Sequence, residues 1–360
     1  MSVLFFRRLL LVAIVYLVCS GCDYKTTSNK ASNRDSNSVG QYKIVSSALA
    51  SISRGQKLFW LTEDAVLFPK MWRGADGRLA SELGIWEISK NTYSTLDHPF
   101  EKKGRVLCRD NERYMVADKS EKKARFYWAT LDVERMKMHV ASEPVDQSRY
   151  RMSPSSEQCE LKSRAVDKSK NTSVHYLNKA GVILVGESLK IIDSSLISIS
   201  DGGLIHRFDG FSLSGLYRYS QSERAYTFIA NSFRKDSPLK IDPNDLHYVV
   251  INENGSVSEF PIPYFVSNSR PKVCDHHLSS QGLILSMAIL SEGADKETDG
   301  LYLLDKNNKF NLIVEGVVGF PSVSPDGCRL AFIHKPFGSP GFNELKYTNL
   351  CAAAKKNTSS

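Results

Sequence analysis

The sequence predicts an all-β fold built from a repeated unit of short strands. Near the C-terminus, residues 321–333 read PSVSPDGCRLAFI, which is a strand, a Pro-Asp-Gly turn and a second strand. Weaker versions of this pattern recur along the chain, and runs rich in aromatic and β-branched residues follow them. These observations indicate many short antiparallel strands. No helix is predicted.

The turn recurs at a nearly constant interval. Its copies begin at residues 62, 108, 153, 199, 242, 279 and 324. The spacing is about 45 residues, with one shorter interval of about 37, which matches the length of a four-stranded repeat. Seven units are therefore expected. Six are the alternative, because the short interval and the weak copy at Asp201 do not fit the pattern well.

Candidate strands fill these units. GLYLLD (300–305) and FNLIVE (310–315) are expected to be the two outer strands of the unit before the clear turn. Third strands are expected at residues 84–89, 124–131, 215–219 and 344–350. The segment 300–334 resembles the repeat of TolB-type β-propellers, in which a strand pair around Ser-Pro-Asp-Gly opens each four-stranded blade. The resemblance implies a propeller and implies no particular activity.

The two ends of the repeated region are expected to meet. The last unit has only three expected strands and ends at Cys351, whereas a strand-like run over residues 42–49 precedes the first unit. If that run completes the last blade, the ring closes without an open edge. We therefore predict a seven-bladed propeller domain over residues 41–351, followed by a flexible tail at 352–360. The broader alternative is another all-β fold, such as a two-sheet assembly.

A leader precedes this domain. Arginines at positions 7 and 8 are followed by an apolar run over residues 9–18, which is too short to span a bilayer as a helix. The residues that end at Cys22 resemble the lipobox of bacterial lipoproteins, although Cys19 stands where that family usually has Leu. The resemblance implies that residues 1–21 are a cleaved signal peptide and that Cys22 is lipidated. The alternative is an ordinary secretory signal.

Residues 22–40 are dominated by Ser, Thr, Asn and Lys, so we expect a flexible tether between the lipid and the folded domain. Asp23 resembles the signal that retains enterobacterial lipoproteins at the inner membrane. The expected location is therefore the cell envelope, with the protein anchored by its lipid. In a Gram-negative cell this would be the periplasmic face of the inner membrane.

The net charge and its distribution limit the kinds of partner that are expected. The formal net charge is +8, which falls to +6 when the two leader arginines are removed, and the basic residues are scattered along the chain. An exported chain without a basic stripe is not expected to bind nucleic acid. An envelope protein, peptide or polymer is the expected partner.

Catalytic and cofactor motifs are missing from the sequence. It contains no H-E-x-x-H, no G-x-S-x-G and no phosphate-binding glycine loop, and its one C-x-x-C spacing, at residues 19–22, lies at the end of the leader. No cofactor is expected. This favours a binding or scaffolding propeller. An envelope hydrolase or lyase is the alternative, because residues distant in sequence can converge on the central channel of a propeller. Whether the protein is an enzyme stays open at this point.

One cluster offers metal-ligand chemistry. Cys274, Asp275, His276 and His277 are adjacent and together provide thiolate, carboxylate and imidazole groups. Neighbouring residues of a strand point to opposite faces, and no second ligand group with suitable spacing stands nearby. These four residues are therefore only weak metal candidates, and we expect a loop that leads into a blade.

Five cysteines remain after lipidation and signal cleavage, which leaves one unpaired. The strands at 329–334 and 344–350 are expected to pair antiparallel, in a register that places Cys328 opposite Cys351. Export to an oxidising compartment makes a disulfide there the first expectation. Cys108 with Cys159 is the second.

The stretch 251–277 distorts the repeat most strongly. It contains three prolines and the aromatic residues Phe260, Tyr264 and Phe265. These aromatics are candidates for partner binding on a loop face, and filling the core of a short blade is the alternative.

Overall fold

The computed structural model describes residues 42–51, 57–73, 79–100, 105–110, 112–118, 124–147, 150–151, 157, 159–161, 183–185, 189–192, 195–198, 200–234, 236–263, 271–289, 299–335 and 343–352. The predicted signal peptide and tether, with Cys22 and Asp23, lie outside the described residues, as does most of the predicted tail. The described part is almost entirely strand, with one helical turn at 350–352. No described helix has the length and apolar character needed to cross a membrane.

The described strands form seven antiparallel sheets, of which six have four strands. The first two sheets contain β2 (Phe59–Thr62), β3 (Ala65–Arg73), β4 (Leu79–Glu87) and β5 (Thr92–Thr95), and then β6 (Arg105–Asp110), β7 (Arg113–Asp118), β8 (Arg125–Asp132) and β9 (Lys137–Pro144). The next two contain β10 (Tyr150–Arg151) and β11 (Glu160–Leu161), and then β12 (Ile183–Val185), β13 (Leu189–Ile192), β14 (Ser195–Ser198) and β15 (Leu204–Arg207).

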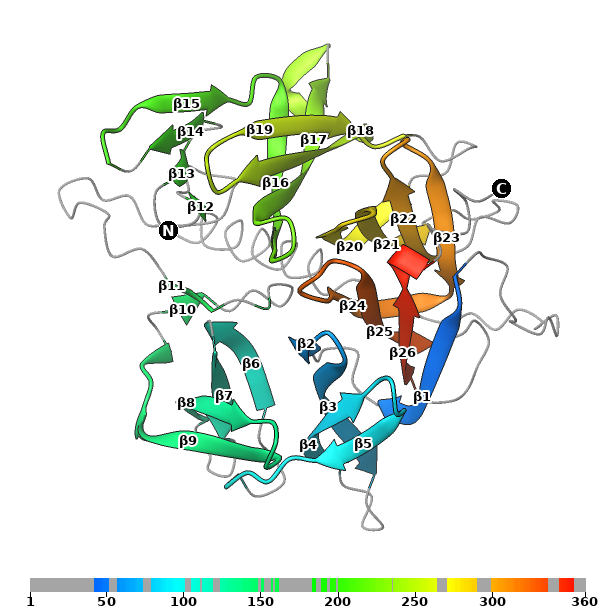
Figure 1. Ribbon diagram of the computed structural model, residues 1–360. Coiled ribbons are helices and arrows are strands. Elements are labelled where there is room, and N and C mark those ends of the chain that lie inside the picture. The colour runs from blue at the N-terminus through cyan, green and yellow to red at the C-terminus, as the bar shows by residue number, and fades with distance from the viewer. Residues whose placement is uncertain are drawn as a thin grey trace, which may run out of the picture.

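The remaining sheets follow in chain order. They contain β16 (Phe211–Ser220), β17 (Ala225–Arg234), β18 (Ser237–Asn252) and β19 (Val257–Pro261), then β20 (Pro271–Ser279), β21 (Gly282–Ile289), β22 (Gly300–Asp305) and β23 (Phe310–Glu315), and finally β24 (Val317–Val323), β25 (Arg329–Lys335), β26 (Asn343–Asn349) and β1 (Ile44–Ser51). In Figure 1 these sheets surround a common centre, and each sheet follows the previous one around the ring. The protein is therefore an all-β propeller.

Apolar side chains between neighbouring sheets form the core. Phe59 and Ile85 of the first sheet pack against Val106 and Val116 of the second, and similar clusters lie between other neighbouring sheets. The innermost strands also contact one another, since β16 contacts β20, β20 contacts β24, and β24 contacts β2. The sheets therefore stack face to face around the centre.

The first strand closes the ring, as predicted. β1 pairs antiparallel with β26, so the N-terminal strand becomes the outer strand of the last sheet. Leu58 and Trp86 of the first sheet pack against Ala331 and Leu345 of the last. The Trp60 indole Nε1–H also donates to the Ser322 carbonyl over 2.9 Å. Chain segments 262 residues apart thus meet at the seam between the first and the last sheet.

Two predicted repeat positions are wrong. The Asp201-Gly202-Gly203 turn joins β14 to β15, which are the third and fourth strands of their sheet. The residues 242–245 lie inside β18, beside register shifts in its pairing with β17. Residues that favour tight turns occur in any hairpin and at irregular places within a strand. They therefore do not show whether a turn follows the first, second or third strand of a blade.

The same error misplaces one strand. Residues 215–219 belong to β16, the first strand of its sheet, rather than to a third strand. The turn that opens this sheet is 221–224, between β16 and β17. The strands expected at 300–305, 310–315 and 344–350 occur as β22, β23 and β26. Seven blades stay a prediction, because only two short strands of the sheet between β9 and β12 lie in the described part.

Candidate functional site

A polar pocket opens at the centre of the ring, where the first strands of several sheets end. Its walls carry charged and hydroxyl-bearing side chains from β6, β16, β20 and β24, from the turns that follow these strands, and from the segment between β10 and β11. The lining residues are Arg109, Glu157, Arg218, Tyr219, Ser220, Gln221, His277, Leu278, Val323 and Ser324. We call the face of the ring that carries these turns the pocket face.

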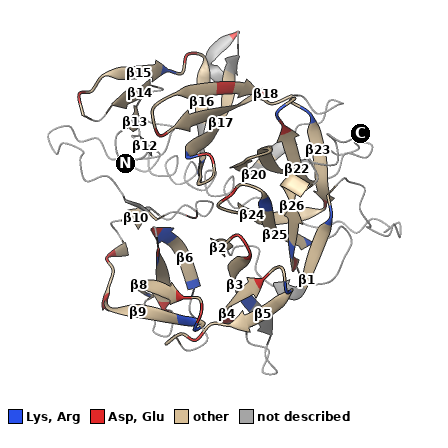
Figure 2. Cartoon of the chain, viewed as in Figure 1, with Lys and Arg blue, Asp and Glu red and all other residues tan. Residues whose placement is uncertain are grey.

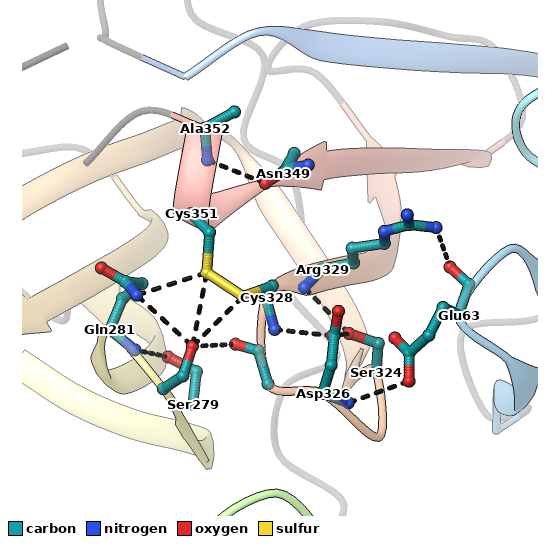
Figure 3. Close-up of a disulfide and its surroundings, with 12 residues drawn as sticks. Glu63, Ser279, Gln281, Ser324, Asp326, Cys328, Arg329, Asn349, Cys351 and Ala352 are labelled. Carbon is teal, nitrogen blue, oxygen red and sulfur yellow. Dashed lines mark hydrogen bonds between the residues drawn. A yellow bond between two sulfur atoms is a disulfide. The ribbon is translucent and has the colours of Figure 1, made fainter. Parts of the chain in front are cut away.

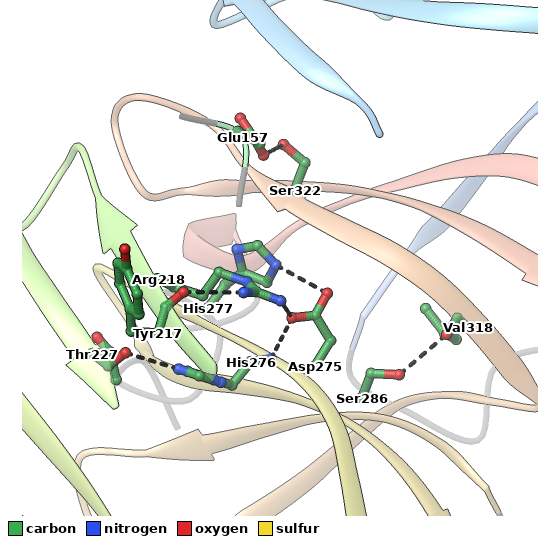
Figure 4. A network of polar contacts seen from close by, with 10 residues as sticks. All are labelled: Glu157, Tyr217, Arg218, Thr227, Asp275, His276, His277, Ser286, Val318 and Ser322. Carbon is green, nitrogen blue, oxygen red and sulfur yellow. Dashed lines mark hydrogen bonds and ion pairs between the residues drawn. The ribbon is translucent and has the colours of Figure 1, made fainter. Parts of the chain in front are cut away.

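β16 and β20 supply the most buried polar group of the pocket. Residues two apart on a strand share a face, so Asp275 and His277 of β20 point together toward Arg218 of β16. Arg218 donates from Nη2 to Asp275 Oδ1, and His277 Nε2 lies 3.5 Å from Asp275 Oδ2. Figure 4 shows the Asp275 carboxylate held between the guanidinium and the imidazole.

His276 points away from this group. Its Nε2 lies 3.0 Å from the Thr227 carbonyl, and its side chain is fully buried. Burial, followed by the positive charge of Arg218, lowers the pKa of His276 to about 3. His276 is therefore a neutral residue of the core near neutral pH.

Asp275 keeps its negative charge despite burial. Loss of solvent alone would raise the pKa of Asp275, but the Arg218 guanidinium, followed by His277, holds that pKa well below its usual range. The Arg218 side chain is only 3% exposed. A buried charge pair of this kind needs further hydrogen bonds, and Arg218 Nη1 donates to the Tyr217 carbonyl over 3.0 Å.

Two buried polar atoms at the pocket keep unused hydrogen-bonding capacity. Neither Arg218 Nε nor His277 Nε2 makes a hydrogen bond within the described part of the chain, although Nε2 faces Asp275. Unpaired buried polar groups are rare in native proteins and are typical of functional sites.

Arg109 and Glu157 form the opposite wall. Arg109 Nη1 donates to the Trp60 carbonyl and Nη2 donates to Gln221 Oε1, both over 2.9 Å. These bonds join three different sheets across the centre of the ring. Glu157 accepts a hydrogen bond from Ser322 Oγ over 2.5 Å. The pocket therefore holds donors from several sheets and one carboxylate.

A disulfide supports this wall. Cys108 is bonded to Cys159, and the backbone of Arg109 exchanges hydrogen bonds of 2.7 Å with Glu157 and Cys159. The segment that carries Glu157 is thereby fixed beside β6. The pairing of Cys108 with Cys159 is the second disulfide expected from the sequence.

The structure also joins Cys328 to Cys351, the first disulfide expected from the sequence (Figure 3). The predicted register is one residue off, because the Leu350 N–H donates to the Cys328 carbonyl over 2.8 Å and Cys351 follows in the helical turn. Ser280 Oγ lies 3.5 Å from both sulfur atoms. The disulfide therefore lies beside the turn that opens the neighbouring sheet.

Two carboxylates meet near this disulfide at the seam of the ring. The Asp326 N–H donates to Glu63 Oε1 over 3.0 Å, and Arg329 donates to the Glu63 carbonyl. Burial, followed by the neighbouring Asp326, raises the pKa of Glu63 to about 7. These contacts connect the first turn of the last sheet to the first turn of the first sheet.

Three of the weak metal candidates, Asp275, His276 and His277, have described side chains, and these do not converge on one point. The cluster lies in strand β20, not in the loop that the sequence predicted. Asp275 pairs with Arg218 of β16, and His276 contacts the Thr227 carbonyl of β17. Asp275 is occupied by Arg218, and His276 points to the other face. Within the described ranges, no group of three or more His, Cys, Asp or Glu residues is placed to hold a metal ion.

The candidate aromatic surface is described only in part. Phe260 lies in β19, is 37% exposed and stacks on Tyr248 with ring centroids 4.8 Å apart. It does not line the pocket. Tyr264 and Phe265 lie outside the described residues, so partner binding by these aromatics stays a prediction.

Most of the residues that line the pocket were not predicted from the sequence. Arg109 and Ser324 were inside recognised turns, but nothing marked them as pocket residues. Arg218, Ser220 and Gln221 were missed because the turn at 221–224 carries no Pro or Gly. The signal that could have found them is the end of a first strand, where side chains of a propeller approach the central axis.

Comparison with solved structures gives fold-level similarity. The chain is similar to an oligogalacturonate lyase in complex with manganese, with 12% identity, a TM-score of 0.49, and coverage of 88% of this chain and 95% of that chain. It is also similar to an oligogalacturonate lyase from Vibrio parahaemolyticus, with 11% identity, a TM-score of 0.49, and coverage of 87% and 94%. For TolB from Acinetobacter baumannii the identity is 13%, the TM-score 0.35, and the coverage 81% and 65%.

No protein-family model matches the chain, and no curated protein matches it either.

Proposed function

We propose that this protein is a lipid-anchored propeller of the cell envelope that binds a polar ligand or partner segment in its central pocket. The observation that carries the proposal is the group formed by Arg218, Asp275 and His277 at the ends of β16 and β20. Three ionisable side chains are buried there beside an open polar pocket. Such an arrangement costs stability and is typical of a binding or active site.

The lining chemistry defines the ligand. Arg109, Arg218 and the two serines can donate hydrogen bonds, and Glu157 can accept them. A ligand that carries oxygen acceptors, such as a carboxylate, hydroxyl or peptide carbonyl, fits these donors. A peptide or an envelope polymer offers such groups.

The anchor is proposed from the leader. Cys22 would carry the lipid, and Asp23 would retain the protein at the inner membrane of an enterobacterium-like cell. Cys22→Ala is expected to abolish fatty-acid labelling and to release the protein into the soluble fraction, since stable anchoring needs more than one acyl chain. Asp23→Ser is expected to move the protein toward the outer membrane. Unchanged labelling and fractionation of the Cys22→Ala protein would refute the anchor.

A second candidate function is catalysis by a hydrolase or lyase. It is favoured by the position of Asp275, which can orient His277 through Nε2 and leave Nδ1 to act as a base. A carboxylate that orients a histidine recurs in unrelated active sites. In this function Arg109 and Arg218 would stabilise negative charge on the substrate.

His277→Gln separates the two functions, because glutamine keeps hydrogen-bonding groups but cannot accept a proton as a base. If the protein is a binding propeller, crosslinking in cells should recover the same partner with wild type and with the variant, in a somewhat lower amount with the variant. If it is an enzyme, the variant should accumulate an uncleaved ligand that wild type converts. Asp236→Asn, in the exposed turn at the other end of β17, is the matched control. Equal recovery of every crosslinked species from wild type, control and variant would contradict a role for the pocket.

A further inference from the structure

The folded domain begins on the same face of the ring as the pocket. The strand register of the last sheet aligns Val323 of β24 with Leu330 of β25, Leu330 with Thr348 of β26, and Thr348 with Ile44 of β1. Val323 lines the pocket, and Ile44 is the first residue of the outer strand. One row of residues therefore runs from the pocket wall to the start of the domain.

The residues before Ile44 lie at the turn end of this sheet. Tyr42 is buried in a cluster with Leu350, and Thr348 Oγ1 donates to the Lys43 carbonyl over 3.1 Å. Leu350 in turn binds Cys328, which follows the Ser-Pro-Asp-Gly turn of the pocket face. The chain that arrives from the N-terminus is thus fixed at the pocket face.

The attachment point lies closer to the pocket than to the opposite face of the ring. Neighbouring strands are about 4.8 Å apart, so three steps place Ile44 about 14 Å from Val323. The ten residues of β17 span roughly 33 Å between the pocket face and the opposite face. About 20 residues connect Cys22 to Tyr42, and a chain of that length reaches at most about 70 Å.

We infer that the anchor, whose chain enters the domain at the pocket face, keeps that face nearer to the membrane on average than the opposite face, so that the pocket meets ligands presented at the membrane surface. The inference rests on the proposed lipidation of Cys22. The turns of this face carry both signs of charge: Glu253 pairs with Arg224 over 2.6 Å, and Asp64 lies 3.6 Å from Arg329. The face therefore has no excess of basic residues in these turns that would attract anionic lipid. Figure 2 shows acidic and basic residues interspersed around the ring among the residues that are described. The point at which the tether enters the domain therefore favours this orientation, and the pocket is left open to its ligand.

The two ends of β17 offer matched reporter positions. Glu223 lies in the turn before β17, on the pocket face, and Asp236 lies in the turn after it, on the opposite face. Both are exposed acidic residues. Glu223→Cys and Asp236→Cys, each with Cys274→Ser, are labelled with the same fluorophore on the full-length lipidated protein. The proteins are reconstituted into phosphatidylcholine vesicles that contain a lipid with a headgroup-linked energy acceptor.

Energy transfer to the acceptor lipid should be at least about twofold stronger from position 223 than from position 236, given the height difference of roughly 33 Å. Equal transfer, or stronger transfer from 236, in protein that floats with the vesicles overturns the orientation and leaves the anchor intact. Protein that does not float with the vesicles overturns the anchor and the orientation together. Thermal unfolding of both labelled proteins checks that each variant is folded.

Discussion

Arg218, Asp275 and His277 concentrate the chemistry of the ring centre in one buried group. Each would be unfavourable alone, since burial penalises an isolated charge. Together they form an ion pair with a histidine beside it, and Asp275 Oδ1 accepts a further hydrogen bond of 2.8 Å from the His276 N–H. The group therefore depends on all of its members.

Removing one charge of this pair should be costly. Asp275→Asn leaves the Arg218 guanidinium buried without a counter-charge, and the free energy of unfolding is expected to fall by about 3–5 kcal/mol. Urea denaturation measures this change. The control is Asp110→Asn, which breaks the exposed pair with Arg113 and should cost less than about 1 kcal/mol. Equal costs in the two variants would contradict a buried ion pair.

His334 should make stability depend on pH. Burial, followed by the charge of Lys346, lowers the pKa of His334 to about 4 in the folded protein, whereas the unfolded chain protonates near 6.5. The unfolded state therefore binds more protons between these values, and stability is lost as the pH falls from 6.5 toward 4. The slope from this residue is at most about 1.4 kcal/mol per pH unit.

The matching measurement compares wild type with His334→Leu by denaturation at pH 7 and pH 5. The variant also loses the 2.6 Å contact between Nε2 and the Glu315 carbonyl, which lowers its stability at both pH values. The pH dependence should nevertheless be smaller in the variant. The same dependence in both proteins would show that His334 titrates normally in the folded state.

At the residue scale the sequence predicted candidates but not their partners. The cluster 274–277 stood out by composition, whereas Arg218 lies 57 residues earlier and became its partner only through the pairing of two sheets. The alternation of side chains on a strand correctly separated His276 from its neighbours. The sequence did not show which face of β20 would contact an arginine, because that contact depends on the packing of one sheet against the next.

At the scale of strands and turns, clear turn chemistry was reliable. The turn at 324–327 has Gly327 at a φ of 74°, which glycine adopts without strain, and the strands around it formed as predicted. The turn at 221–224 has Arg224 at a φ of 48° instead of a glycine. Such a turn has no strong sequence signal, and the blade that begins at β16 was therefore misplaced.

The disulfide between Cys328 and Cys351 should stabilise the last sheet. It closes a loop with a sequence separation of 23, for which the chain-entropy model gives about 3 kcal/mol. The double variant Cys328→Ala and Cys351→Ala is expected to lose about that much in urea denaturation. Peptide mapping without reductant should find both native pairs. Free thiols at all four positions would contradict both disulfides.

At the scale of the whole molecule, ring closure by β1 is the feature that the sequence predicted best. The sequence had an unassigned strand at its N-terminal end and a last blade with only three strands, and pairing the two closes the ring. The number of blades was harder to predict, because the count depended on degenerate turns. Position along the chain also did not reveal that Arg109 and Gln221, 112 residues apart, meet across the centre.

Removal of β1 should open the ring. A chain that begins at residue 52 exposes the edge of β26 and loses the Ser47 Oγ–H bond to the Leu345 carbonyl. It is expected to aggregate or to unfold at a lower temperature. A chain that begins at residue 41 keeps β1 and should unfold cooperatively. Thermal unfolding followed by circular dichroism compares them, and identical melting curves would contradict closure by β1.

The pocket face is proposed to receive the partner of this protein. The most direct measurement is photocrosslinking in cells from a light-activated amino acid placed at Gln221, which lines the pocket, and in a second protein at Asp236 on the opposite face. We expect a discrete crosslinked species from position 221 that is absent from position 236 and weakened by His277→Gln. The same species from both positions, or a species from position 236 alone, would contradict it.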